Sequence, residues 1–183
     1  VPFSLPLVAG AAQQICGLID KIIVTPDGHT VPLDHKTTAA FASAGGFRYD
    51  WLDKWALNGQ LIAYAFAVTL NTGKQAPFAI VDASLVHKTH FHYHKQLPIT
   101  ITAQDIEGWL EDAEATAWRI NTAKFDGVYE KAGLLNGACN TPRECVYKNL
   151  CAGGFDWRNG ARPSDMVEKP WEPVASGVLE KTP

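Results

Sequence analysis

This 183-residue chain lacks a long apolar run, because its longest, LIAYAFAVTL, has only ten residues. A membrane-spanning helix needs about 20 consecutive apolar residues, so we expect no membrane partner. A positively charged leader with a cleavage site is also absent, so the sequence gives no indication of secretion and favours a cytoplasmic location. The first residue is valine rather than methionine, from which we expect that an upstream segment is missing.

An excess of positive charge is lacking as well. The formal net charge is −3, which predicts no general attraction to nucleic acid. Such a partner would have to be held by a local patch or by metal ions. The apolar fraction of 46% and the charged fraction of 19% are those of an ordinary globular domain with a sizeable core.

Cysteine is scarce but clustered. Of the four cysteines, Cys139, Cys145 and Cys151 lie within thirteen residues, and Cys16 is far away. Two disulfides are possible, but clustered cysteines in a chain of this size without a leader more often indicate a metal site. Thiolates at this spacing bind zinc or an iron–sulfur cluster. The absence of C-x-x-C pairs argues against a standard zinc ribbon, and four reduced structural thiols remain an alternative.

The order of apolar patterns predicts a mixed α/β fold. We expect strands at 2–8, 13–24, 31–36, 77–86 and 89–101, with a turn at 26–28 between the second and third. Residues 37–49 are expected to form a loop. A helical region at 50–70, in two pieces meeting near residues 58–59, should end at 71–73. A last helix should begin with a Thr102–Asp105 cap and pack through Ile106, Trp109, Leu110, Ala113, Ala117 and Ile120.

We therefore expect three regions. Residues 1–125 form the core, 126–160 a cysteine-rich segment that binds a metal or cluster, and 161–183 an extended tail. The segment from 126 onward is rich in Gly, Asn and Pro, and a cross-link would help to offset its ordering entropy.

Acidic residues meet on the predicted hairpin. The turn at 26–28 brings Asp20 opposite Asp34 to within a residue or two, and two carboxylates side by side repel unless a cation lies between them. Mg²⁺ or Mn²⁺ fits such oxygen ligands. Lys36 shares a strand face with Asp34 and could orient a water or stabilise a phosphate. The His35 side chain points away, but its carbonyl could add a metal ligand.

Two side chains with polar end groups lie on the apolar helix that follows. Gln60 and Tyr64 are four residues apart and hence on one face, where a polar cleft would satisfy them. An acid-x-lysine pair is common by chance. The ordered set of Asp20, then Asp34-x-Lys36, then Gln60-x-x-x-Tyr64 is much less so.

The segments CGLIDKI, PLDHKTT and NGQLIAYAF together resemble the RecB-like branch of the PD-(D/E)XK nucleases. The resemblance implies a restriction-endonuclease-like α/β core with a mixed central sheet flanked by helices. It implies metal-dependent hydrolysis of DNA, with Asp20 and Asp34 as metal ligands and Lys36 as the catalytic lysine. Gln60 and Tyr64 match the motif that positions this lysine and the DNA strand. The family's upstream histidine or glutamate has no match here.

The cysteines extend this resemblance. A subset of RecB-like nucleases ends in a three-cysteine segment that holds a 4Fe–4S cluster with a fourth, upstream cysteine. Cys139, Cys145 and Cys151 match that segment, with zinc as the alternative. Cys16 is more typical of a buried core residue, so we expect the fourth ligand upstream of Val1. The implied setting is the cytoplasm of a bacterial, archaeal or phage-infected cell, with single-stranded DNA or duplex ends as substrate and protein partners in repair, recombination or phage replication.

Three further points stay open. His90, His92 and His94 would share one strand face, which is best interpreted as exposed and polar. Arg143 and Lys148 could contact a DNA backbone. A nuclease-like fold that serves as a non-catalytic DNA-binding or scaffold module in a larger assembly is the alternative function.

Overall fold

The structure is a computed structural model that describes residues 1–6, 14–40, 45–89, 93–126 and 145. These residues fall into two compact units, one of residues 1–115 and one that begins at Thr116. The predicted divisions after residues 125 and 160 stay predictions. None of the helices in the described ranges is long and apolar enough to cross a membrane.

The expected strand at 13–24 is wrong as a single element. It is two strands in different sheets, β2 (Gln14–Leu18) and β3 (Lys21–Val24), separated at Ile19 and Asp20. β2 pairs antiparallel with β1 (Pro2–Pro6) in a two-stranded sheet. Ile19 is 2% exposed, and burial of this side chain in the core accompanies the departure of the chain from β1. The break places Asp20 at the start of the second sheet.

The predicted hairpin is confirmed between β3 and β4 (Thr30–Thr38). Gly28 sits in the turn at φ 87°, a left-handed conformation that glycine adopts without steric cost. The antiparallel register pairs Lys21 with Leu33. β4 extends two residues beyond the prediction, into the expected loop at 37–49.

The helical region is in two pieces, as predicted: α1 (Tyr49–Asp53) and α2 (Gly59–Thr72). The Asn58 side chain caps α2 by accepting hydrogen bonds from the backbone N–H groups of Gln60 and Leu61. α2 ends at Gly73, whose φ of 66° and N–H bond to the Thr69 carbonyl make a left-handed C-cap.

The second sheet has the order β3-β4-β5-β6. β5 (Phe78–Leu85) runs parallel to β4, and β6 (His94–Thr100) runs antiparallel to β5. The sheet is therefore mixed, as predicted. β6 begins at His94 rather than near residue 89, and residues 90–92 lie outside the described ranges.

The last helix, α3 (Ala103–Asp126), begins with the predicted cap. The Thr102 N–H donates to Asp105 Oδ2 at 2.8 Å, and the Asp105 N–H donates to Thr102 Oγ1 at 3.1 Å. Of the predicted apolar face, Ile106 is buried but Ile120 is 60% exposed. The expectation for Ile120 is wrong among the described residues, because this residue lies in the second unit and its side chain is exposed.

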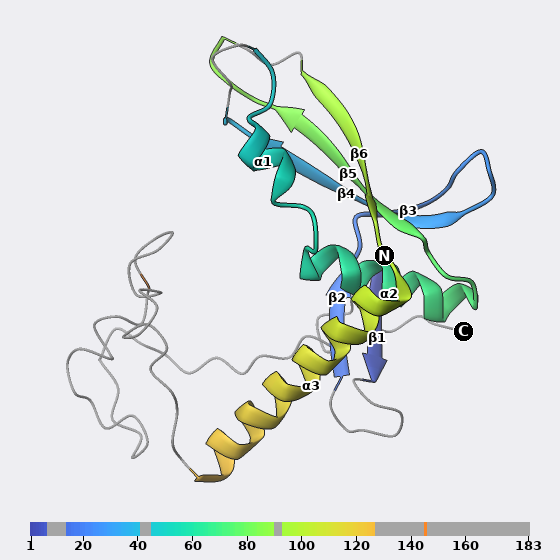
Figure 1. The fold of residues 1–183 in the computed structure, drawn as a ribbon, viewed down its shortest axis with the longest axis vertical. Coiled ribbons are helices and arrows are strands. Elements are labelled where there is room, and N and C mark those ends of the chain that lie inside the picture. Colours follow the sequence, from blue (N-terminus) through green and yellow to red (C-terminus); the bar gives the residue numbers. More distant parts are fainter. Residues whose placement is uncertain (7–13, 41–44, 90–92, 127–144, 146–183) are drawn as a thin grey trace. The chain divides into compact units, whose positions relative to one another are not determined.

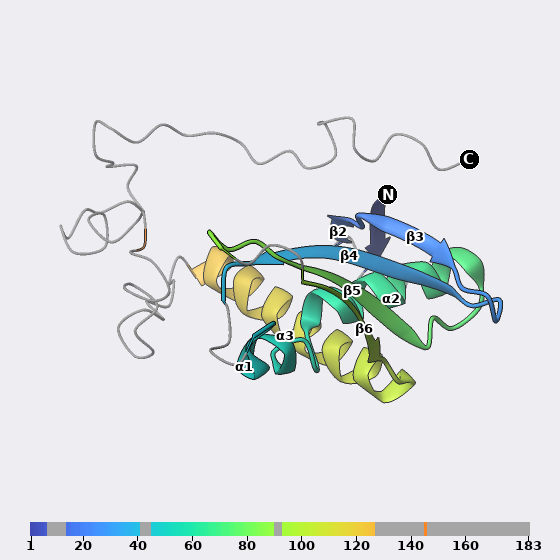
Figure 2. The ribbon, with the colours of Figure 1, turned by 90° about the horizontal axis from the view of Figure 1, so that it is seen from above.

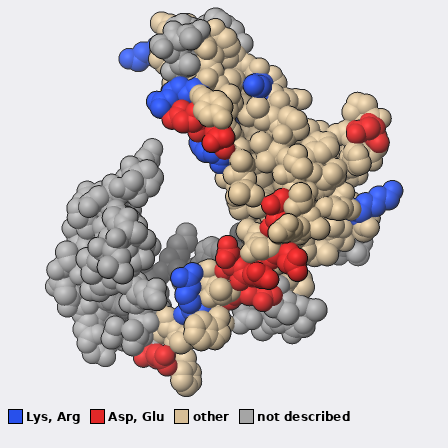
Figure 3. All heavy atoms as spheres, in the orientation of Figure 1, with Lys and Arg blue, Asp and Glu red and all other residues tan. Residues whose placement is uncertain are grey.

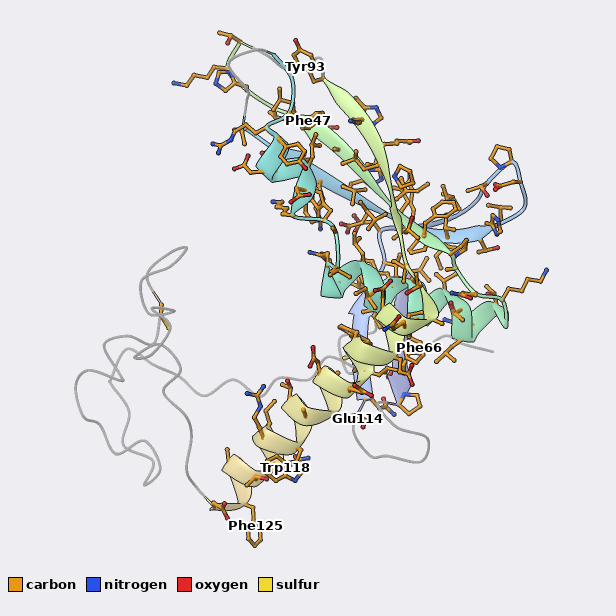
Figure 4. All side chains as sticks on the ribbon, viewed as in Figure 1. Phe47, Phe66, Tyr93, Glu114, Trp118 and Phe125 are labelled. Carbon is orange, nitrogen blue, oxygen red and sulfur yellow. The ribbon has the colours of Figure 1, made fainter. Side chains whose placement is uncertain are left out.

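The main core lies between α2 and one face of the four-stranded sheet, and Figure 2 shows α2 and the first half of α3 on that side. α2 packs against β4 and β5 and also touches β1 (Figure 1). Phe66 of α2, labelled in Figure 4, packs near α3, where its ring centroid lies 6.3 Å from that of Trp109. The arrangement is the α/β fold that was expected, a mixed sheet flanked by helices.

Candidate active site

The two hairpin carboxylates lie where the register predicts them. Lys21 pairs with Leu33 at the end of the β3–β4 ladder, so one further step sets Asp20 opposite Asp34. Asp20 Oδ2 accepts a hydrogen bond of 2.9 Å from the His35 N–H, which ties the loop residue to β4. Asp20 is exposed, whereas Asp34 is 2% exposed. One carboxylate is therefore held at the surface and the other beneath it.

Lys36 is fixed between a strand acid and a helix amide. Its Nζ lies 2.6 Å from Asp34 Oδ2 and donates to Gln60 Oε1 at 3.1 Å. Gln60 Nε2 in turn donates to the Tyr64 hydroxyl at 2.8 Å. Gln60 is exposed and Tyr64 is buried, so the chain of contacts runs from the protein interior to the surface. The structure thus brings together Asp34, Lys36, Gln60 and Tyr64.

The two-stranded β1–β2 sheet contacts the buried end of the Lys36–Gln60–Tyr64 series. The Phe3 ring meets the Tyr64 ring edge-on, with centroids 5.9 Å apart. Gly17 lies opposite Phe3 in the β1–β2 ladder, and a Cβ at this position would come 2.8 Å from the Phe3 ring. Such a contact is too close for carbon atoms, so glycine is required for Phe3 to reach Tyr64.

Two buried polar atoms beside Lys36 have no hydrogen-bond partner among the described residues: Asp34 Oδ2 and Trp55 Nε1. The Lys36 ammonium touches Asp34 Oδ2 as an ion pair, but not with hydrogen-bond geometry. It also lies 5.6 Å from the Trp55 ring centroid. Asp34 Oδ2 is therefore neutralised by an ion pair, and of the two atoms only Trp55 Nε1 has neither a hydrogen bond nor an ion pair within the described ranges.

The Asp34 carboxylate is also a suitable ligand for a metal cation. Mg²⁺ is usually bound by one or two carboxylates together with waters and substrate phosphate. Asp34 and Asp20 supply such a pair, and no group of three or more His, Cys, Asp or Glu side chains within the described ranges could hold a metal ion. The donor set therefore suits Mg²⁺ or Mn²⁺ better than a metal that needs a full protein cage.

The His35 side chain lies on the opposite face of the sheet, as strand alternation predicts. Its Nδ1 is 2.7 Å from Asp82 Oδ2, and His94 Nε2 is 2.7 Å from Asp82 Oδ1. Gln96 adds a third contact to Asp82 at 3.3 Å. Burial raises the pKa of Asp82, but the hydrogen bonds from His94 and Gln96 and the nearby His94 charge outweigh it, so this pKa lies below its usual value. His35 thus anchors β4 to β5 directly behind the candidate site.

The other predicted residues lie mostly outside the described part of the chain. Cys139, Cys151, His90, His92, Arg143 and Lys148 all fall on residues that the structure does not describe. Cys145 and Cys16 are half-buried and form no disulfide with described residues. His94 is exposed on β6, which agrees with the polar face expected for that strand.

Two residues near the site were not anticipated from the sequence, Trp55 and Asp82. The sequence does carry a signal for Asp82, which is a lone acid within the apolar strand PFAIVDASLV and so needs partners. Trp55 follows Trp51 by one helical turn, a spacing that places both rings on one face. The proximity of Trp55 to Lys36 could not be predicted, because it depends on how α1 and the turn after it dock.

Comparison with known sequences agrees with this geometry. A profile of the PD-(D/E)XK nuclease superfamily matches residues 2–152. No curated protein matches the chain, and no solved structure matches it.

Proposed function

The chain belongs to the PD-(D/E)XK nuclease superfamily, and from this premise we propose that it is a metal-dependent deoxyribonuclease of the RecB-like, exonucleolytic type. The observation that carries the proposal is the buried Asp34 carboxylate, ion-paired with a lysine that also donates to Gln60, whose amide in turn donates to Tyr64. In this proposal Asp20, Asp34 and the His35 carbonyl hold Mg²⁺ or Mn²⁺. The substrate is DNA, and the setting is the cytoplasm during repair, recombination or phage replication.

Lys36 has the main chemical role among the chain's own residues. An ammonium has three N–H donors; one donates to Gln60 and one faces Asp34. The third remains for the attacking water or a phosphate oxygen. The Lys36 side chain is 24% exposed, so substrate can reach it. Positioned in this way, it stabilises charge that develops on the phosphate.

The carboxylates define where the phosphate reacts. A divalent metal, when bound, lowers the pKa of a coordinated water and stabilises charge on the phosphoryl oxygens. The His35 N–H keeps Asp20 directed toward β4, and burial of Asp34 on β4 keeps its carboxylate from rotating into solvent. Asp34 is therefore positioned by its strand and Asp20 by its hydrogen bond to that strand, and such preorganisation positions reacting groups effectively.

The cysteine segment is the second part of the proposal. We propose that Cys139, Cys145 and Cys151 bind a 4Fe–4S cluster. Their spacing supports this, and the family match extends through residue 152 and so includes all three. Anaerobically purified protein should be brown and contain iron and sulfide. Colourless protein with stoichiometric zinc would replace the cluster with zinc.

The function is tested by incubating the protein with end-labelled single-stranded and duplex DNA, with Mg²⁺, with Mn²⁺ and with a chelator. We expect cleavage with either metal and none with the chelator. DNA binding that the chelator leaves unchanged, with no cleavage under any metal, would instead favour the non-catalytic DNA-binding module.

A further inference from the structure

Beside the candidate site, an exposed lysine lies on two tryptophan rings. Lys54 Nζ is 4.5 Å from the Trp55 ring centroid and 5.1 Å from that of Trp51. The two rings meet edge-on at 5.4 Å and are buried, while Phe47 stacks on Trp51 at 5.3 Å. Cation–π contacts of this kind contribute roughly 0.5–1 kcal/mol each at exposed sites. The aromatic rings therefore hold the ammonium near one position.

Lys54 and Lys36 share a ring. Lys36 Nζ lies 5.6 Å from the Trp55 centroid and Lys54 Nζ lies 4.5 Å from it, so at most about 10 Å separates the two ammonium groups. Successive phosphates of a stacked strand advance by about 3.4 Å along the helix axis. The two lysines therefore lie within about three nucleotides of each other along a bound strand.

Lys54 is also available for a ligand. Within the described ranges it makes no ion pair, whereas the nearby Arg48 is occupied by Asp50 through contacts of 2.6 Å and 2.9 Å. Figure 3 shows basic and acidic side chains together over α1, in contrast to the acidic side chains that gather over the first half of α3. Lys54 is thus a positioned, unneutralised cation next to the candidate site.

We propose that Lys54 is a second phosphate-binding position, which contacts the DNA backbone one to three nucleotides from the phosphate at Lys36. The rings of Trp51 and Trp55 position the Lys54 ammonium through cation–π contacts. This inference rests on the proposed function, since it names how the same site holds its substrate. Lys54 does not take part in bond cleavage. It fixes the register of the strand, the usual work of phosphate contacts.

The test is fluorescence anisotropy with the full chain and a labelled single-stranded oligonucleotide, without divalent metal and over a range of salt concentrations. Lys54→Ala should weaken binding roughly three- to tenfold and reduce the slope of log K against log salt by about 0.7, the value for one phosphate contact on a single strand. Lys54→Arg should bind nearly as well as wild type. Lys74→Ala, which changes an exposed lysine beyond the far end of α2, should leave affinity and slope unchanged.

A Lys54→Ala protein with wild-type affinity and salt slope would overturn the inference, as would equal losses in Lys54→Ala and Lys74→Ala. The measurement needs no cleavage. A protein that binds DNA with the expected Lys54 dependence but never cleaves it would refute the nuclease proposal and leave the phosphate contact standing.

Discussion

Replacement of Tyr64 by phenylalanine tests whether the buried end of the contact chain acts on Lys36. The change removes only the hydroxyl that accepts the hydrogen bond from Gln60 Nε2 at 2.8 Å. One neutral hydrogen bond is worth roughly 0.5–1.5 kcal/mol. Without this bond Gln60 is oriented less well and positions Lys36 less well. If the full free energy of the bond is lost from the transition state, kcat should fall about two- to tenfold. The KM for DNA should change little.

The assay is cleavage of labelled DNA at saturating substrate and metal, with thermal unfolding recorded in parallel. Thr69→Val is the matched control, because Thr69 lies on the same helix and its hydroxyl donates to the Ala65 carbonyl and accepts from the Ala76 N–H, far from Lys36. The control should lose comparable stability and keep its kcat. A Tyr64→Phe enzyme as fast as wild type would refute the idea that the hydroxyl acts through Gln60.

Two further changes test the support of the site. Gly17→Ala should lower the free energy of unfolding by roughly 1–3 kcal/mol, because the added Cβ overlaps the Phe3 ring; Gly108→Ala in α3, where nothing lies within 4 Å, should stabilise by about 0.5–1 kcal/mol. Equal effects in urea denaturation would contradict this account. Asp82→Asn should cost roughly 1–3 kcal/mol at neutral pH. The folded pKa of Asp82 is lowered. The stability difference between wild type and Asp82→Asn should therefore be present above the unfolded pKa of about 3.9 and shrink as the pH falls through the folded pKa. A stability difference that stays constant from about pH 7 to pH 3 would argue against this role of Asp82.

The hairpin and the acid pair could be predicted from the sequence because their signals are local. The turn at 26–28 fixes the register of β3 and β4, and that register alone brings Asp20 opposite Asp34. The four-residue spacing of Gln60 and Tyr64 likewise places them on one helix face. The position of Lys36 next to Gln60 follows once α2 packs on β4.

Other features depend on long-range packing and could not be predicted in this way. No turn residues mark the break at Asp20. The chain divides there because β2 pairs with β1 in a separate sheet, which is a tertiary contact. The parallel register that sets His35 beside Asp82 is decided by how β5 crosses back along β4. The Trp55 ring reaches Lys36 through the docking of α1, which local sequence does not encode.

The central claim is that Lys36, held by Asp34 and Gln60, is the catalytic lysine of a DNA-cleaving site. It is tested most directly by the cleavage rate of Lys36→Ala relative to wild type, with Mn²⁺ and DNA both saturating and with folding checked by circular dichroism. We predict a fall of about 100-fold or more, as expected for loss of a group that stabilises charge in the transition state. Equal cleavage by the two folded proteins would contradict it.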